Sequence, residues 1–253
     1  MAKQNLTKIK DYSSDHESSI RREALNLFKN CPIPEDQIMH NLGLFLSSKS
    51  LSRILFMDHI FKQVIDVPGV VFEFGTRWGQ NTALFSALRG IYDPFNRHRK
   101  IVGFDTFTGF AEVTEEDGTS VMMKKGNLTL TKGYYDYLTK IMEYHESENP
   151  LSHIKKFELV KGDANIEVVK YFKDHSETIV SLAFFDFDVY KPTKKCLEAI
   201  KPRLVKGSVI GFDELNDPDS PGETLALDEV FGLNNIKLKR HKFTSRTSYF
   251  VIE

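Results

Sequence analysis

The sequence has 253 residues, a formal net charge of −1 and a hydrophobic content of 41%. A chain of this length can bury a sizeable core as one α/β domain with additions. The near-neutral charge gives no global basic field, so we expect no nucleic acid partner. No apolar run is long enough to span a bilayer, and the first residues form no apolar leader. We therefore expect no membrane partner and a cytoplasmic protein, in which the distant Cys31 and Cys196 stay reduced.

Three regions follow one another along the chain. Residues 1–18 are polar and charged, which predicts a mobile arm. Residues 19–65 predict a helical cap or interface segment, because apolar residues in its second half recur at three- and four-residue spacings. Asp66-Val67-Pro68-Gly69 ends that pattern. Residues 66–253 are then expected to form the main domain.

Apolar runs of strand length alternate with helical stretches from residue 70 onward. The predicted strands are 70–74, 101–105, 157–160, 179–186 and 209–213, and the predicted helices are 82–89, 164–174, 193–200 and 223–231. This alternation predicts a parallel sheet covered by helices on both faces. Segments 236–242 and 248–252 have no helix between them, which predicts a terminal antiparallel hairpin added to the sheet.

The connection between the second and third predicted strands is long. It contains an acidic loop at 115–118 and a predicted helix at 134–146. A long connection in a compact domain is usually a lid or a binding element, so we predict a lid-like insertion at 106–150.

A glycine-rich turn follows the first predicted strand. Its pattern is Glu73-x-Gly75-x-x-x-Gly79, in which glycine allows positive φ and a close approach of the backbone to a ligand. The turn lacks the GxGxxG of dinucleotide folds and the lysine of a phosphate loop. It therefore predicts a nucleotide-like ligand with an amino-acid tail and no phosphate. The alternative is a strand-to-helix turn that uses glycine only for tightness.

Two single acids follow the next strands, at the edge of the sheet where open α/β sheets bind ligands. Asp105 ends the strand 101–105, where a carboxylate can accept both hydroxyls of a ribose. Asp163, in Gly162-Asp163-Ala164, can accept a hydrogen bond from an adenine amino group. The alternatives are a plain turn residue at Asp105 and a helix N-cap at Asp163, and the N-cap is compatible with the adenine contact.

Two pairs of carboxylates follow the last parallel strands, Asp186 with Asp188 and Asp213 with Glu214. Hard divalent cations prefer several oxygen ligands, and unpaired acids in a cleft would otherwise have raised pKa values. We therefore expect a metal-binding or catalytic role for this group. The alternative is that these residues are solvated loop acids.

In this order, the four patterns resemble those of the class I S-adenosylmethionine-dependent methyltransferases. More narrowly, the chain resembles the macrocin-type sugar O-methyltransferases over roughly residues 40–253. The resemblance is carried by the segment 68–79, by Asp105-Thr106-Phe107-Thr108-Gly109-Phe110, by Asp186-x-Asp188-x-Tyr190 with Pro192-Thr193, and by Asp213-Glu214. Glu214 stands where the family usually has Asp or Asn, and the histidine that serves as base in some relatives has no clear counterpart.

The resemblance implies a Rossmann-like seven-stranded sheet in the order 3-2-1-4-5-7-6, with an antiparallel last strand and an N-terminal helical extension. It implies S-adenosylmethionine as cofactor and a divalent cation, Mg²⁺, held by Asp188, Asp213 and Glu214. It also implies Asp186 or Asp188 as the catalytic base, unless a histidine takes the proton. The implied donor-binding residues are Glu73, Phe74, Gly75, Thr76, Arg77, Trp78, Gly79, Asn81, Thr82, Asp105, Thr106, Phe107, Gly162, Asp163, Ala164 and Asp186.

We therefore expect a metal-assisted O-methyltransferase that acts on a sugar hydroxyl. The acceptor would be a glycoside or a nucleotide-linked sugar, such as a deoxyhexose or heptose for a surface polysaccharide. The segments 19–65 and 106–150 would cover the acceptor, and the N-terminal helices would form the interface of a homodimer or larger homo-oligomer. The alternatives are an N-methyltransferase on an amino sugar and a non-catalytic nucleotide-binding protein.

Overall fold

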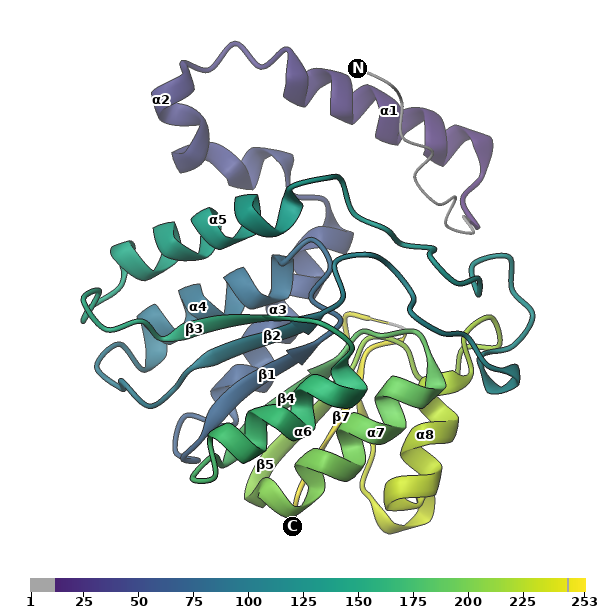
Figure 1. The fold of residues 1–253 in the computed structure, drawn as a ribbon. Coiled ribbons are helices and arrows are strands. Elements are labelled where there is room, and N and C mark those ends of the chain that lie inside the picture. Colours follow the sequence, from purple (N-terminus) through teal and green to yellow (C-terminus); the bar gives the residue numbers. More distant parts are fainter. Residues whose placement is uncertain (1–11, 245) are drawn as a thin grey trace.

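One seven-stranded sheet runs through the protein in the order β3-β2-β1-β4-β5-β7-β6, which confirms the predicted topology (Figure 1). The computed structural model describes residues 12–244 and 246–253. The strands are β1 (Val70–Phe74), β2 (Ile101–Asp105), β3 (Phe157–Lys161), β4 (Val180–Phe185), β5 (Leu204–Phe212), β6 (Lys239–Arg240) and β7 (Ser248–Val251). The first five strands pair in parallel, and β7 pairs antiparallel with β5 and β6. The chain reverses its direction of strand addition between β1 and β4, which is where such sheets bind ligands.

Helices cover both faces of the sheet because neighbouring strand residues point to opposite sides. The helices of this domain are α3 (Ser48–Lys62), α4 (Gln80–Tyr92), α5 (Tyr134–Glu148), α6 (Ala164–Asp174), α7 (Tyr190–Ile200) and α8 (Gly222–Phe231). Phe72 and Phe74 of β1 pack into a core with α6, α7 and α8. Val71 and Phe184 face the other way and pack against α3 and α4. Figure 1 shows α3, α4 and α5 on one side of the sheet and α6, α7 and α8 on the other.

Two predicted strands differ from the observed ones by more than two residues in length. β5 begins at Leu204, before the predicted start, because Lys206 and Gly207 interrupt the apolar pattern without ending the strand. β6 spans only Lys239–Arg240, so the hairpin is confirmed but its edge strand is short. A short, basic edge strand is one way in which proteins prevent edge-to-edge pairing.

The N-terminal helices lie above the body as an arm (Figure 1). They are α1 (Asp15–Lys29), α2 (Glu35–Ile38) and the 3-10 helix η1 (Met39–Phe45), and none of them contains a buried residue. Ser14 caps α1 in a capping box with Glu17, whose carboxylate accepts the Ser14 backbone N–H at 2.8 Å. The helix therefore begins inside the predicted polar arm. Residues 1–11 of that arm lie outside the described residues.

The insertion after β2 returns to the carboxyl ends of the strands. Its first part closes a loop in which the Phe110 N–H donates to the Asn127 carbonyl at 2.9 Å. The 3-10 helix η2 (Glu115–Asp117) then places the buried Asp117 carboxylate at the start of α7, where it accepts the Tyr190 N–H at 2.5 Å. Within the described ranges, no helix is long and apolar enough to cross a bilayer.

Candidate functional site

A first cavity, called here the inner cavity, opens at the carboxyl ends of β1, β2, β3 and β4. Its wall includes Gly75, Arg77, Asp105, Thr106, Phe110, Gly162, Asp163, Ala164, Asp186, Asp188 and Lys191. Nine of the predicted site residues therefore meet here, although they come from four different strand ends: Gly75, Arg77, Asp105, Thr106, Gly162, Asp163, Ala164, Asp186 and Asp188.

Asp105 holds two turns of the inner cavity together. Its two carboxylate oxygens accept the backbone N–H groups of Arg77 at 2.7 Å and Phe107 at 2.6 Å. Both of these residues have positive φ, at 46° and 58°, which side chains other than glycine rarely adopt. Burial raises the pKa of Asp105, and the two backbone donors oppose that rise. Asp105 thus stabilises a strained backbone beside the cavity, which is typical of ligand sites.

Asp163 is the N-cap of α6, which confirms one of the two interpretations of this residue. Its carboxylate accepts the Asn165 backbone N–H at 3.0 Å at the start of α6. The same residue also lines the inner cavity, so the N-cap does not exclude a ligand contact.

The glycine turn brings β1 close to β4 at the cavity. Gly75 has φ of 91°, and a Cβ there would lie 2.1 Å from the backbone carbonyl oxygen of Asp186. Gly79 has φ of 76° and caps α4. Glu73 lies beneath this turn, only 1% exposed, where it accepts a hydrogen bond from the Thr82 hydroxyl. Burial raises the pKa of Glu73 to about 7, against the hydrogen bond from Thr82.

The remaining predicted donor-binding residues surround the inner cavity without forming its wall. They are Glu73, Phe74, Thr76, Trp78, Gly79, Asn81, Thr82 and Phe107. Phe74 belongs to the core of the sheet, and Phe107 packs with α5. Trp78 lies edge-to-face on Tyr134 at 4.7 Å. Their contact with a ligand stays a prediction.

A second cavity, the acidic cavity, adjoins the inner cavity and measures about 560 Å³. Its wall contains Asp186, Asp188, Asp213, Glu214, Asp217 and Asp219, together with Lys49, Arg77, Arg246 and the N-terminal Tyr12 and Ser13. Four residues border both cavities: Arg77, Leu128, Asp186 and Asp188. The two carboxylates are therefore at the place where ligands in the two cavities would meet.

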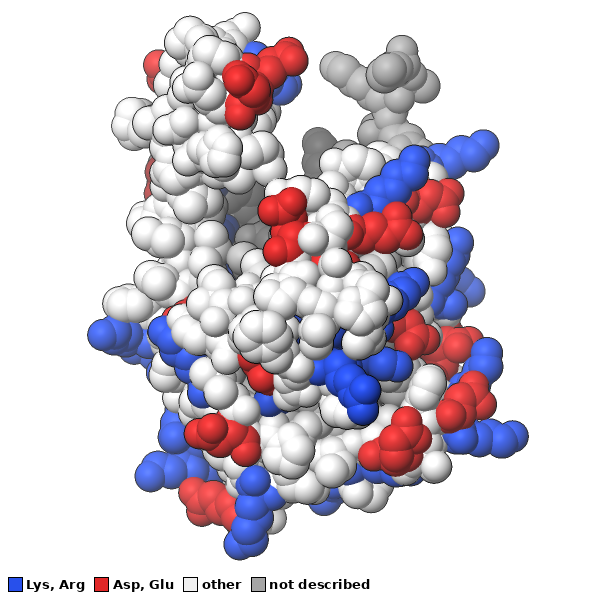
Figure 2. Space-filling model, turned by 90° about the vertical axis from the view of Figure 1, so that its left-hand side faces the viewer, with Lys and Arg blue, Asp and Glu red and all other residues white. Residues whose placement is uncertain are grey.

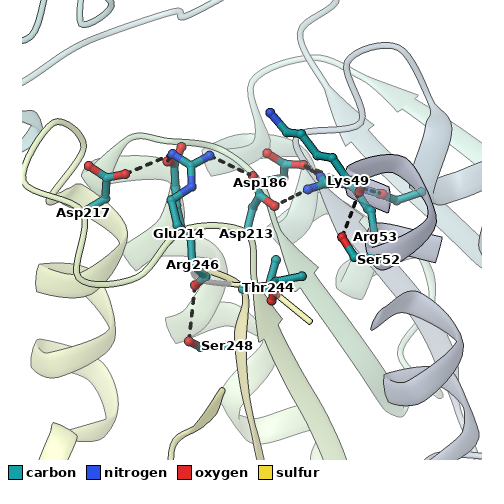
Figure 3. A network of polar contacts seen from close by, with 12 residues as sticks. Lys49, Ser52, Arg53, Asp186, Asp213, Glu214, Asp217, Thr244, Arg246 and Ser248 are labelled. Carbon is teal, nitrogen blue, oxygen red and sulfur yellow. Dashed lines mark hydrogen bonds and ion pairs between the residues drawn. The ribbon is translucent and has the colours of Figure 1, made fainter. Parts of the chain in front are cut away.

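Arg53 of α3 connects the acids of two strands (Figure 3). Its guanidinium contacts Asp186 at 2.5 Å, pairs with Asp213 and donates to the Asn81 side chain at 3.2 Å. Burial and the negative charge of the nearby Asp213 raise the pKa of Asp186, and the positive charge of Arg53 opposes that rise. The sequence analysis did not identify Arg53, because its helix was interpreted only as a cap.

Arg246, next to β7, binds the acids on the other side of the cavity (Figure 3). It pairs with Glu214 at 2.6 Å and with Asp217 at 3.0 Å, and it lies 4.0 Å from Asp213. Two arginines from segments far apart in the sequence thus compensate one acidic cluster. Nothing in the local sequence around Arg53 or Arg246 indicates this arrangement.

Asp188 and Glu223 are buried acids that pair with no arginine among the described residues. Asp188 has φ of 62° and is 8% exposed, and burial together with its hydrogen bond to Glu214 raises its pKa well above the usual range. Glu223 is fully buried and accepts the Phe187 N–H at 2.9 Å, and burial raises its pKa as well. The cluster therefore carries more acid than the two arginines can neutralise.

The predicted metal ligands fit a hard cation by chemistry but are already engaged. Asp188, Asp213 and Glu214 offer only carboxylate oxygens, which suit Mg²⁺. Arg53 and Arg246 contact two of them, and Asp188 bonds Glu214. As the side chains lie, no three His, Cys, Asp or Glu residues in the described part of the chain are arranged to hold an ion.

The chain is similar to solved structures of methyltransferases. It is 38% identical to CalS11, calicheamicin methyltransferase, with a TM-score of 0.92, covering 98% of this chain and 99% of that one. The apo structure of CalS11, described as a TDP-rhamnose 3'-O-methyltransferase, is 37% identical with a TM-score of 0.84, covering 95% and 96% of the two chains. The O-methyltransferase NovP is 18% identical with a TM-score of 0.60 over 79% of each chain, which shows the fold alone.

No protein-family model and no curated protein sequence matched the chain. The similarity to CalS11 is nonetheless well above what fold alone would give, and it extends over both chains almost completely. It covers the sheet, both cavities and the N-terminal helices. The chain therefore belongs to the macrocin-type family of class I, S-adenosylmethionine-dependent sugar O-methyltransferases.

Proposed function

We propose that the protein methylates a hydroxyl of a nucleotide-linked deoxyhexose, with the methyl donor in the inner cavity and the sugar in the acidic cavity. The observation that carries the proposal is the shared border of the two cavities, where Asp186 and Asp188 would meet both ligands. The CalS11 relatives support a sugar joined to a nucleotide and a hydroxyl rather than an amino acceptor. A role in surface polysaccharide synthesis, in the cytoplasm, remains part of the proposal.

The inner cavity suits the donor by the chemistry of its wall. Asp105 and Asp163 offer carboxylates for the ribose and adenine of S-adenosylmethionine, and Gly75 and Arg77 border the side where its methionine would lie. The bound donor supplies a methyl group activated by the sulfonium charge. The chain must then mainly position the acceptor oxygen in line with that methyl group. Asp186 and Asp188 can each take the hydroxyl proton at this border.

We further propose that Asp188, Asp213 and Glu214 hold a divalent cation, Mg²⁺. A cation there would lower the pKa of the acceptor hydroxyl by its positive charge. It would also compensate the acids that Arg53 and Arg246 leave unneutralised. Because Arg246 is half exposed, its side chain can leave Glu214 without opening the core.

Asp213→Asn with chelation tests this site. Loss of one ligand charge is expected to lower turnover by about 100-fold or more, while S-adenosylmethionine binding stays within about threefold. The matched control is Asp217→Asn, because Asp217 also pairs with Arg246 but is not a proposed ligand. Full turnover in excess EDTA would contradict the cation, and methyl transfer to no sugar nucleotide in a screen would contradict the proposed function.

We also propose that the N-terminal helices join two copies of the chain. Ile20, Leu25, Leu27 and Phe28 of α1 are each between 45% and 65% exposed, so one helix presents four large apolar side chains to solvent. Figure 2 shows the part that rises above the body as a largely uncharged surface. We expect Leu27→Glu to shift the protein to smaller species in light scattering. The control Ile91→Glu, at an equally exposed position of α4, should not do so.

A further inference from the structure

The acidic cavity continues into a third cavity on the side of α3, called here the side cavity. The side cavity measures about 450 Å³, and three residues border both: Lys49, Asp213 and Arg246. The rest of its wall is Ser48, Ser52, Arg53, Phe243, Thr244 and Thr247. It shares no wall residue with the inner cavity. A ligand whose reactive end lies beside the methyl donor could therefore extend through the acidic cavity and past Lys49 into the side cavity.

We propose that the side cavity binds the nucleoside of the sugar nucleotide, with Lys49 on its diphosphate and Phe243 stacked on its base. This inference rests on the proposed function, because it requires an acceptor that is joined to a nucleotide. The two cavities together are of a size that accommodates such a ligand, since single ligand pockets measure about 300–1,000 Å³.

Lys49 borders both cavities at this junction, and its ammonium is not paired with any of the described acids. Of the cations that border this junction, Arg53 and Arg246 are held by Asp186, Asp213, Glu214 and Asp217. The Lys49 ammonium, in contrast, has no hydrogen bond or ion pair with any described residue. Figure 3 shows its side chain extending past Arg53, with the ammonium joined to none of the acids by a dashed line.

A diphosphate needs such a charge at this place. The acids of the neighbouring cavity would repel a phosphate, so an anionic ligand binds only where a cation compensates it. A neutral glycoside has no anionic group that could pair with the Lys49 ammonium. The ammonium also suits phosphate as a compact charge that needs no fixed geometry.

Phe243 lines the same cavity, and the Lys242 ammonium lies over one side of its ring, 4.8 Å from the centroid. The Phe243 side chain is 49% exposed, although its ring contacts His241 edge-to-face at 4.9 Å. Base stacking on an exposed aromatic ring is a common way to bind nucleotides without reading the base. Ser48, Ser52, Thr244 and Thr247 supply hydroxyl groups along the wall, which can hydrogen-bond ribose or base.

Calorimetry on the enzyme loaded with S-adenosylhomocysteine tests the proposal with three probes: thymidine diphosphate, uridine diphosphate and thymidine. Lys49→Ala should weaken the binding of both diphosphates about tenfold and leave the binding of thymidine unchanged, because only the diphosphates carry negative charge. Phe243→Ala should weaken all three about fivefold or more through lost stacking. With a sugar nucleotide as substrate, both variants should raise its KM by the same factors and leave the KM of S-adenosylmethionine unchanged.

Two control variants match the chemistry at other places. Lys62→Ala removes a lysine of the same helix that is paired with Asp58 at 2.7 Å, and Phe95→Ala removes an exposed phenylalanine outside all three cavities. Both controls should bind every probe as the unchanged protein does.

The inference is overturned if Lys49→Ala binds the diphosphates normally, or if Phe243→Ala behaves like Phe95→Ala. In either case methylation of sugar nucleotides by the unchanged protein would leave the proposed function intact. If instead the unchanged protein binds no diphosphate and methylates only neutral glycosides, the nucleotide-linked acceptor itself is wrong, and the side cavity proposal is wrong with it.

Discussion

The inner cavity and the acidic cavity are built in different ways. The inner cavity is formed by short turns that directly follow strands. Hydrogen bonds to the backbone hold these turns, such as the two that Asp105 accepts from backbone N–H groups. The acidic cavity is formed by side chains from segments far apart in the chain. Arg53 precedes the first strand, and Arg246 lies beside the last one, yet both contact Asp213 or its neighbour Glu214.

Under the proposed function, this difference would separate donor binding from acceptor binding. Because the turns of the inner cavity depend on local backbone geometry, a change in the acidic cavity should leave the donor site intact. The reverse should also hold, since Asp105 and Asp163 lie outside the wall of the acidic cavity. Among the described residues, Arg77, Leu128, Asp186 and Asp188 belong to both walls, so changes at these four should affect both ligands most directly.

The largest effect is expected for Arg53→Met. The change leaves Asp186 and Asp213 without the guanidinium that pairs with both. Because the pair is only partly buried and solvent screens it, its loss should lower the free energy of unfolding by about 3 kcal/mol or less. We expect kcat to fall about 100-fold, because Asp186 is no longer oriented toward the acceptor, while the affinity for S-adenosylmethionine stays within about threefold. Steady-state kinetics and calorimetry measure the two quantities.

Arg53→Lys is the matched control, because it keeps the charge but loses the planar fork that reaches two acids. Its kcat should lie between that of the unchanged protein and that of Arg53→Met. An equal loss of donor affinity and kcat in Arg53→Met would mean that the two cavities are not independent.

Asp105→Ala should affect the inner cavity and leave the acidic cavity largely intact. Without its carboxylate, the left-handed backbone at Arg77 and Phe107 loses both hydrogen bonds that stabilise it. We expect S-adenosylmethionine to bind about 30-fold more weakly, with a smaller effect on the binding of the acceptor nucleotide. Asp163→Ala removes an N-cap in the same wall but leaves these turns intact, so it should cost less. A larger loss in Asp163→Ala would contradict the role of Asp105.

The same contrast explains what the sequence could predict. The alternation of strands and helices, the glycine turn and the acids at the strand ends follow from patterns within a few residues. The order of the strands in the sheet was implied by the family resemblance, and the observed sheet confirms it. The N-cap at Asp163 was predictable from a local pattern as well. Arg53 and Arg246 were missed because an arginine on an amphipathic helix or beside a hairpin has no local signal. Their partners are set by how α3 and β7 pack on the sheet, which periodicity does not reveal.

The smallest effect concerns the packing of the hairpin on α3. The His59 and His241 rings lie 5.0 Å apart, and the His59 Nε2 contacts the Tyr249 hydroxyl at 2.8 Å. Burial lowers the pKa of both histidines, with Lys239 adding to the effect at His59, and His59 and Lys242 adding to it at His241. The His241 Nδ1 is also buried without a hydrogen-bond partner among the described residues.

Because the histidine pKa values are lower in the folded protein, the unfolded chain binds more protons than the folded chain once the pH falls toward about 6.5 and below. The two histidines therefore lower the free energy of unfolding as the pH falls through this range. Glu73, whose pKa is raised to about 7, acts in the opposite direction. So do the other buried acids with raised pKa values, Asp105, Asp186, Asp188 and Glu223, and the test must therefore compare variants rather than follow one protein. Urea unfolding at pH 8 and pH 5.5 should show a smaller pH-dependent loss in His241→Asn than in the unchanged protein. A loss of equal size in the two proteins would exclude the histidine pair as its source, while His98→Asn, at an exposed loop position, should leave the loss unchanged.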